Sequence, residues 1–438
     1  MMLDSVSLRK RQAIEELSAR YDEPIWLLQH RLKSWRLYED ILPPSGKEEE
    51  WRRTDLSALS LEGVRLFPGP VTHVPAPRRN GRDGYAGAIV QRDGVTLSRR
   101  LASDLERQGI VFSDLHSVAR EYPDLFRTYF MTEAVQPIAW KFVALHAALW
   151  RGGVFLHVPA GAQTTVPLHA GVGLSRSGGI AVFPHTLIVA EEGSSVTLVE
   201  EHASPDDDRP GLSSGAVEIL VRDGATVRYV GVQDWGKNVN SFSTIRAVLG
   251  AESQLELGLV GSGSRVAKDT VEAILGAPGA NAKIVGLFLA GGEQHMSYAT
   301  LQDHRAANTT SDLLFKSVLN DSAHLVWNGL TRIRKGAAES DANQSNRNLL
   351  LGENARVAPI PVLEIEAHDV TRCSHGATVS SVDEEQVYYM MSRGLTRQDA
   401  TQAIVDGFLR QGLECLTPVR GHDGIGRALE RRLLAKVA

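Results

Sequence analysis

The segment Gly193–Leu198 reads GSSVTL, a glycine and small residues leading into an alternating strand, and this plan recurs along the middle of the chain. The other clear copies are GAQTTV at Gly161–Val166, GATVRY at Gly224–Tyr229 and GANAKI at Gly279–Ile284, with weaker copies from Ala251 and Glu353. The first three glycines lie about thirty residues apart with no helical pattern between them, which is typical of a solenoid whose stacked units share one core.

Residues 141–382 have this texture throughout, so we predict a mostly β fold whose core is a parallel β-helix, or β-solenoid. Coils stacked at about 4.8 Å would align like side chains in ladders. An antiparallel sandwich or jelly roll built from the same alternating strands is the alternative, although it gives no reason for self-similarity. The number and handedness of the coils stay open.

The sequence patterns near both ends of the chain predict helices. In the N-terminal region, residues 1–110, Trp26, Leu28, Leu32 and Trp35 recur at three- and four-residue steps or close to them, which favours a helix. The rest of that region, to about Gly109, is rich in Pro, Gly and Arg and predicts an extended or poorly packed connection.

The C-terminal domain, residues 383–438, carries clearer helix signals. Capping-box patterns occur at Ser381–Glu384 and Thr396–Asp399, and Gly394 should end the first helix between them. The predicted buried stripe of the second helix is Ala400, Ala403, Ile404, Gly407 and Phe408, and a basic helix through Arg427, Arg431, Arg432 and Lys436 should follow. These helices would either cap the solenoid or dock a partner.

The composition excludes several classes of function. A net charge of −5 over 438 residues gives no basic field for nucleic acid. No run of 18 apolar residues occurs, and no apolar stretch follows Arg9–Arg11, so we expect no membrane association, no export and a cytoplasmic location. The two cysteines, Cys373 and Cys415, fit a reducing compartment.

Ordinary catalytic motifs are missing from the sequence: it has no phosphate-binding Walker loop, no nucleophile elbow, no His-Glu-x-x-His and no Cys-x-x-Cys. Their absence argues against a nucleotide hydrolase, a serine hydrolase and a structural zinc site. Acidic pairs such as Asp269 with Glu272, or Glu364 with Glu366, leave a β-solenoid carbohydrate enzyme as a remote alternative. Solvated charges on an outward face explain such pairs more simply.

The most suggestive cluster is His368–His375, which contains Cys373. On a strand, Cys373 and His375 share a face, so a thiolate and an imidazole would reach one soft metal. Two ligands make half of a metal site, and a second chain, a bridging sulfide or another coil would have to supply the rest. The structural alternatives are a buried cysteine and a coil-stacking histidine. His295, His304 and His324 lie in other predicted coils and are not assigned to a site.

The segment CSHGATV at Cys373–Val379, followed by Asp383–Tyr389 and Ser392–Leu395, resembles the C-terminal signature of the SufB/SufD family of iron–sulfur cluster assembly proteins. Further matches to the family are Pro24–Leu28, Glu50–Leu56, Gly153–Pro159 and Asn346–Gly352. Residues 57–105 have no clear counterpart.

This resemblance implies a β-helix between helical ends and a non-catalytic scaffold role. It implies pairing with SufB through the β-helix cores and docking of the SufC ATPase on the C-terminal helices. A nascent iron–sulfur cluster would be held transiently and shared with SufB. The resemblance leaves open a homodimer when SufB is absent, and whether a reduced flavin is bound on this chain or on SufB.

Within the family, this chain is most like SufD. SufB proteins have a glutamate where Gly376 stands, and a functional cysteine one coil earlier, at the place assigned to Asn346. The resemblance assigns the metal-facing role to His375, with Cys373 as the weaker candidate. A SufB-like scaffold that binds a cluster on its own remains the alternative.

Overall fold

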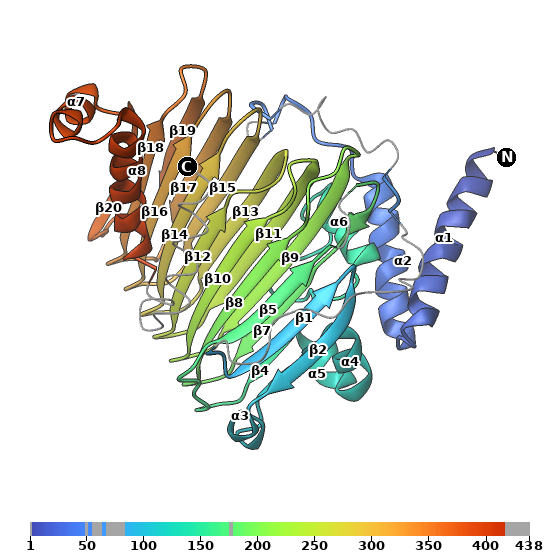
Figure 1. Cartoon of the computed structure of the whole chain (residues 1–438). Helices are drawn as coiled ribbons and strands as arrows, with labels where there is room; N and C mark the ends of the chain where they lie inside the picture. The colour runs from blue at the N-terminus through green and yellow to red at the C-terminus, as the bar shows by residue number, and fades with distance from the viewer. Residues whose placement is uncertain (1, 49–50, 55–63, 67–83, 175–177, 417–438) are drawn as a thin grey trace.

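The computed structural model describes residues 2–48, 51–54, 64–66, 84–174 and 178–416. Its body is a β-solenoid of about eight turns between residues 154 and 381, with helices at both ends (Figure 1). Strands of successive coils pair in parallel, as β10 does with β8 on one side and β12 on the other. The predicted β-helix is therefore confirmed, and the antiparallel sandwich is excluded.

Two sheets form the walls of the solenoid, and each coil contributes one strand to each wall. The first sheet contains, in spatial order, β2 (Val95–Leu101), β1 (Gly87–Arg92), β5 (Leu168–Gly173), β8 (Ser195–Ala203), β10 (Thr226–Asp234), β12 (Gln254–Gly261), β14 (Asn281–Ala290), β16 (Thr310–Leu319), β18 (Asp341–Leu350) and β20 (Arg372–Ser381). The second contains β19 (Arg356–Ile365), β17 (His324–Ile333), β15 (His295–His304), β13 (Val266–Leu275), β11 (Val239–Leu249), β9 (Gly211–Val221), β7 (His185–Ala190), β4 (Val154–Val158) and β3 (Val111–Asp114), with β6 (Ala181–Val182) paired to β9.

The repeated glycine is the corner residue at which the chain enters a strand of the first sheet. Gly193 and Gly224 have φ angles of +64° and +65°, in the left-handed region where glycine carries no steric penalty. In the weaker copy, Glu252 takes this conformation at +51°. The repeat in the sequence thus marks a repeated corner. Before β16 and β18 the same left-handed conformation is taken by Asn308 and Glu339 instead of glycine.

Alternate side chains of each strand point into the lumen and form the main core. One ladder runs through Leu198, Tyr229, Leu257, Ile284 and Leu313, which occupy matched positions in successive coils and are nearly or fully buried. Such stacking buries apolar surface that no single coil could bury alone.

Eight helices lie in the described residues: α1 (Met2–Arg20), α2 (Ile25–Asp40), α3 (Ser103–Arg107), α4 (Leu115–Glu121), α5 (Pro123–Tyr129), α6 (Lys141–Leu149), α7 (Glu384–Ser392) and α8 (Arg397–Leu413). In the part of the chain that the structure describes, none of them is long and apolar enough to cross a membrane.

A buried ion pair joins α2 to the residues that lead into the solenoid. Arg31 is fully buried and donates to Glu23 from Nε at 2.8 Å and from Nη2 at 2.6 Å. Its Nη1 donates to the carbonyl oxygens of Ala148 and Trp150, and its guanidinium lies 4.3 Å from the Trp150 ring centroid. Burial opposes ionisation of Glu23, but the charge of Arg31 and hydrogen bonds outweigh it and lower the pKa to about 2.

Two elements differ from the sequence prediction. Lys141–Leu149 was expected to begin the β region but forms α6, which packs against α2 and β9. Its last seven residues are all buried, so the segment has no polar face. The sequence therefore lacks the alternation of apolar and polar residues by which a surface helix is predicted. The connection expected to be loose contains the β1–β2 hairpin, which pairs in parallel with β5. The turn at Asp93-Gly94 was the missed signal.

The C-terminal helices also require two corrections. Asp383, not Ser381, caps α7, whereas Thr396 caps α8 as predicted by accepting from the Asp399 amide. The buried face of α8 is Ala400, Val405, Leu409 and Gly412, which shares only Ala400 with the predicted stripe. Ala403 and Gly407 are exposed, because the helix packs on β14 and β16 through the neighbouring positions. The predicted basic helix through Arg427 and Lys436 lies outside the described residues.

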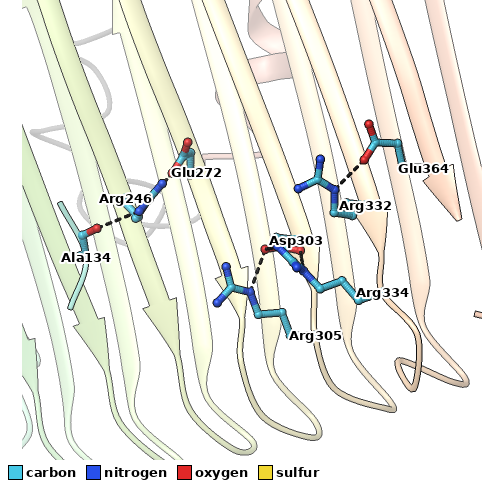
Figure 2. Close-up of polar contacts among 8 residues, drawn as sticks. All are labelled: Ala134, Arg246, Glu272, Asp303, Arg305, Arg332, Arg334 and Glu364. Atoms are coloured by element: carbon cyan, nitrogen blue, oxygen red, sulfur yellow. Dashed lines mark hydrogen bonds and ion pairs between the residues drawn. The ribbon is translucent and has the colours of Figure 1, made fainter. Parts of the chain in front are cut away.

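Ion pairs connect neighbouring coils on the outer face of the second sheet (Figure 2). Asp303 on β15 is fully buried beneath Arg305 and Arg334, whose Nε atoms lie 2.8 and 2.7 Å from its carboxylate. Burial alone would raise the pKa of Asp303, but the hydrogen bonds from Arg334 and Arg305 lower it. Arg246 with Glu272 and Arg332 with Glu364 bridge coils in the same way.

Candidate functional site

The last coil of the solenoid is open at its end. Within the described residues, β19 pairs only with β17 and β20 only with β18, so both outer strand edges keep unpaired backbone groups. Val362, Ile365 and Val379 on these strands are 42–48% exposed. An open edge with exposed apolar side chains is what another chain needs in order to add strands.

Cys373 and His375 both lie on β20 and point to the lumen side of this open coil. Cys373 is opposite Ala342 in the ladder and packs beside Ile333 and Ala337, half-buried. Burial raises the pKa of its thiol, which favours the protonated form at neutral pH. His375 is exposed. The structure therefore places the two predicted residues on one face, with the imidazole the more accessible.

Polar side chains fill the lumen directly beneath these two residues. Gln344, opposite His375 in the ladder, is fully buried and donates to the Val362 carbonyl. Asn348 donates to Asn346 and, at 2.9 Å, to the Thr378 carbonyl. The lumen beneath the last strand is thus lined by amide side chains. Sequence reasoning missed them because amides in strands look like surface residues.

The described residues contain no group of three His, Cys, Asp or Glu side chains that could hold a metal ion. His295 and His324 meet with ring centroids 5.0 Å apart, but His304 is buried elsewhere, between Thr309 and Ser311. Within this part of the chain, Cys373 and His375 can supply only part of a coordination shell.

The acidic pairs do not form a glycosidase site. Asp269 lines the lumen, whereas Glu272, three residues on, pairs with Arg246 on the outer face. Glu364 pairs with Arg332. Two carboxyl groups that act on one glycosidic bond must face a common space. This geometry therefore does not support the hypothesis of a β-solenoid carbohydrate enzyme.

Asp269 instead lines a cavity of about 50 Å³ in the lumen, which was not predicted from the sequence. Burial raises the pKa of Asp269 to about 7. Glu200, in the same cavity, accepts from the Tyr229 hydroxyl at 2.8 Å and is 3.0 Å from Nε2 of His202. The sequence feature that could have predicted this cavity is the presence of polar residues at lumen-facing positions of β8 and β13.

The two C-terminal helices present a second surface. Lys316 on β16 holds α8 in place, because its Nζ donates at 2.7 Å to both the Phe408 carbonyl and Oε1 of Gln411. Burial lowers the pKa of Lys316 to about 8. On α7, Tyr388 and Tyr389 are 74% and 59% exposed. Tyrosine is among the residue types that are enriched at protein interfaces.

Comparison with known proteins gives consistent results along the chain. Residues 174–408 match the family described as SUF system FeS cluster assembly, SufBD core domain. The iron-sulfur cluster assembly protein SufD of Bacillus subtilis (strain 168) is 32% identical over 406 residues, which cover 91% of this chain and 92% of the relative. SufB of the same organism is 30% identical over 416 residues, covering 91% and 88%. A SufBD family protein of Staphylococcus epidermidis is 31% identical over 414 residues, covering 90% and 87%.

Proposed function

Because the chain belongs to the SufB/SufD family of iron–sulfur cluster assembly proteins, we propose that it is the SufD-type scaffold subunit of a complex with SufB and the SufC ATPase. It would contribute one half of a shared cluster-forming site and a docking domain for the ATPase, without chemistry of its own on ATP.

The observation that carries this proposal is the incomplete site on an open edge. His375 and Cys373 lie on the last strand of the solenoid, and no third metal ligand joins them among the described residues. A chain that holds a cluster by itself needs a fuller ligand set. A partner strand beside β20 would bring further ligands next to His375, which fits a site shared between two similar subunits.

The choice of SufD over SufB rests on particular residues. Asn346 is buried at 2% exposure and hydrogen-bonded to Asn348, at the place assigned to the SufB cysteine. Gly376 follows His375 where the SufB pattern has a glutamate. Both differences remove a metal-competent side chain. The slightly higher identity to the Bacillus SufD than to its SufB points the same way.

We assign ATPase docking to the C-terminal domain, residues 383–438. Lys316 and the buried face of α8 fix that helix to the solenoid, so a force applied to α7 and α8 would reach the sheet that ends in β20. Movement of docked ATPase subunits could in this way open or close the shared site.

Co-purification with SufB and SufC tests the assignment. The wild-type chain should form a complex with both. Replacing Tyr388 and Tyr389 together by serine should release SufC and leave SufB bound, since both rings belong to α7 and neither belongs to the edge strands β19 and β20. If the wild-type chain binds neither partner, or holds a full cluster alone after reconstitution, the SufD assignment is wrong.

A further inference from the structure

A surface cavity of about 400 Å³ lies on the outer face of the first sheet, at the end opposite to β20. Its volume is within the range of small-molecule sites. It exists because glycines replace side chains on one strand: Gly171 and Gly173 of β5 point outward, between Val90 and Arg92 on β1 and Glu201 and Ala203 on β8. These glycines make a floor of bare backbone on which a flat group can lie.

One wall of the cavity is aromatic. The ring of His169 lies beside the floor, with Cε1 3.4 Å from the position that a Cβ on Gly171 would take. The Tyr85 ring packs on His169 with the ring centroids 4.8 Å apart. His169 is only 9% exposed, and its Nε2 has no hydrogen-bond partner among the described residues, lying 3.9 Å from Glu201. A buried polar atom without a hydrogen bond is costly unless a ligand satisfies it.

The rim carries opposite charges on opposite sides. Arg92 reaches over the floor, with Nε 4.0 Å from the Cβ position of Gly173. Arg100 faces the cavity from β2, across Ala88 from His169, and donates to the Tyr85 carbonyl. Glu201 stands on the far side, on β8. The two guanidinium groups suit a phosphate or carboxylate, and the carboxylate suits a hydroxyl or amine.

We propose that this cavity binds a small organic anion in which a phosphate is joined to a planar ring through a hydroxyl-bearing linker, as in a nucleoside monophosphate. The phosphate would lie against Arg92 and Arg100, the ring on the floor of Gly171 and Gly173, and a hydroxyl against Glu201. The site is independent of the iron–sulfur site, since it lies on β1 and β5 at the other end of the sheet (Figure 1).

Titration of the full-length chain with AMP, followed by calorimetry, tests this site, with ribose 5-phosphate and inorganic phosphate as partial ligands. Gly171→Val fills the floor without backbone strain, because Gly171 has an ordinary strand conformation and valine suits strands. Arg92→Gln removes one anion contact and leaves the floor intact. Arg36→Gln, an exposed arginine on α2, is the matched control.

AMP should bind the wild type more tightly than either partial ligand. Both cavity variants should weaken the affinity for AMP by about tenfold or more. Arg92→Gln removes a charge-assisted hydrogen bond, and Gly171→Val fills the space that the ring would occupy. The control should bind as the wild type does, and unchanged thermal unfolding would show that the variants are folded. No AMP binding in the low-millimolar range, equal binding of AMP and inorganic phosphate, or binding that both variants retain would each overturn the proposal.

Discussion

Replacing Arg31 by methionine should uncouple the N-terminal helices from the solenoid. Methionine keeps most of the side-chain volume but removes the guanidinium, which makes two hydrogen bonds to Glu23 and two to the carbonyl oxygens of Ala148 and Trp150. The variant leaves the Glu23 carboxylate buried without its cation, at a position where its side chain is only 1% exposed.

The size of the loss follows from the pKa of Glu23. A fall from 4.5 to about 2 corresponds to about 3 kcal/mol of stabilisation of the folded state. Breaking a buried ion pair by removing one partner costs about 3–5 kcal/mol, in agreement with that figure. We therefore expect Arg31→Met to lower the free energy of unfolding by about 3 kcal/mol at pH 7.

The same pair predicts a pH dependence. Because the folded-state pKa of Glu23 is depressed, its contribution is present above pH 4.5 and is lost as the pH falls from 4.5 toward 2. The wild type should lose stability over that interval more steeply than Arg31→Met, so that the difference between the two proteins shrinks in acid.

Urea unfolding followed by tryptophan fluorescence measures both effects, because Trp150 lies against the Arg31 guanidinium. Arg11→Met is the control: Arg11 pairs with Glu15 at 2.9 Å on an exposed face, and its loss should change stability by about 0.5 kcal/mol or less. A loss below about 1 kcal/mol for Arg31→Met, or equal losses for both variants, would refute the reasoning.

Four further substitutions test the solenoid and its attached helix. Lys316→Met should weaken attachment of α8 by about 2 kcal/mol, because the Phe408 carbonyl loses its donor, and limited proteolysis should then release the C-terminal helices sooner. Gly329→Ala should cost about 1–3 kcal/mol in thermal unfolding because its Cβ meets a tryptophan ring, whereas Gly376→Ala, with open space around it, should be neutral. Asp303→Asn should cost about 1 kcal/mol at low salt and less at high salt, since its arginine partners are half-exposed and can regain water.

The solenoid could be predicted from sequence because its signal is local and repeated. Several corners contain a residue with positive φ, and at three successive coils this residue is a glycine: Gly161, Gly193 and Gly224. Thr396 was equally readable, since an N-cap acts within one helical turn. Where a single residue or dipeptide fixes the backbone, the sequence pattern and the structure agree.

Features that depend on packing between distant segments could not be read in this way. The helix α6 is buried on nearly every side, so its residues carry no period. The face of α8 is set by Lys316 and the sheet beneath it, about ninety residues earlier in the chain. The strand period of two predicts that Cys373 and His375 lie on the same face of β20. The buried amide side chains beneath them could not be predicted, because their burial depends on the neighbouring coil.

The most direct test of the shared-site account is iron–sulfur absorbance after anaerobic reconstitution of the complex with SufB and SufC, comparing wild type with His375→Ala. Because His375 is exposed on β20, its loss should leave complex formation unchanged and reduce the cluster signal. Ser374→Ala, on the outward face of the same strand, should keep the signal. A full cluster signal in His375→Ala would contradict the account and leave this chain as a mechanical partner only.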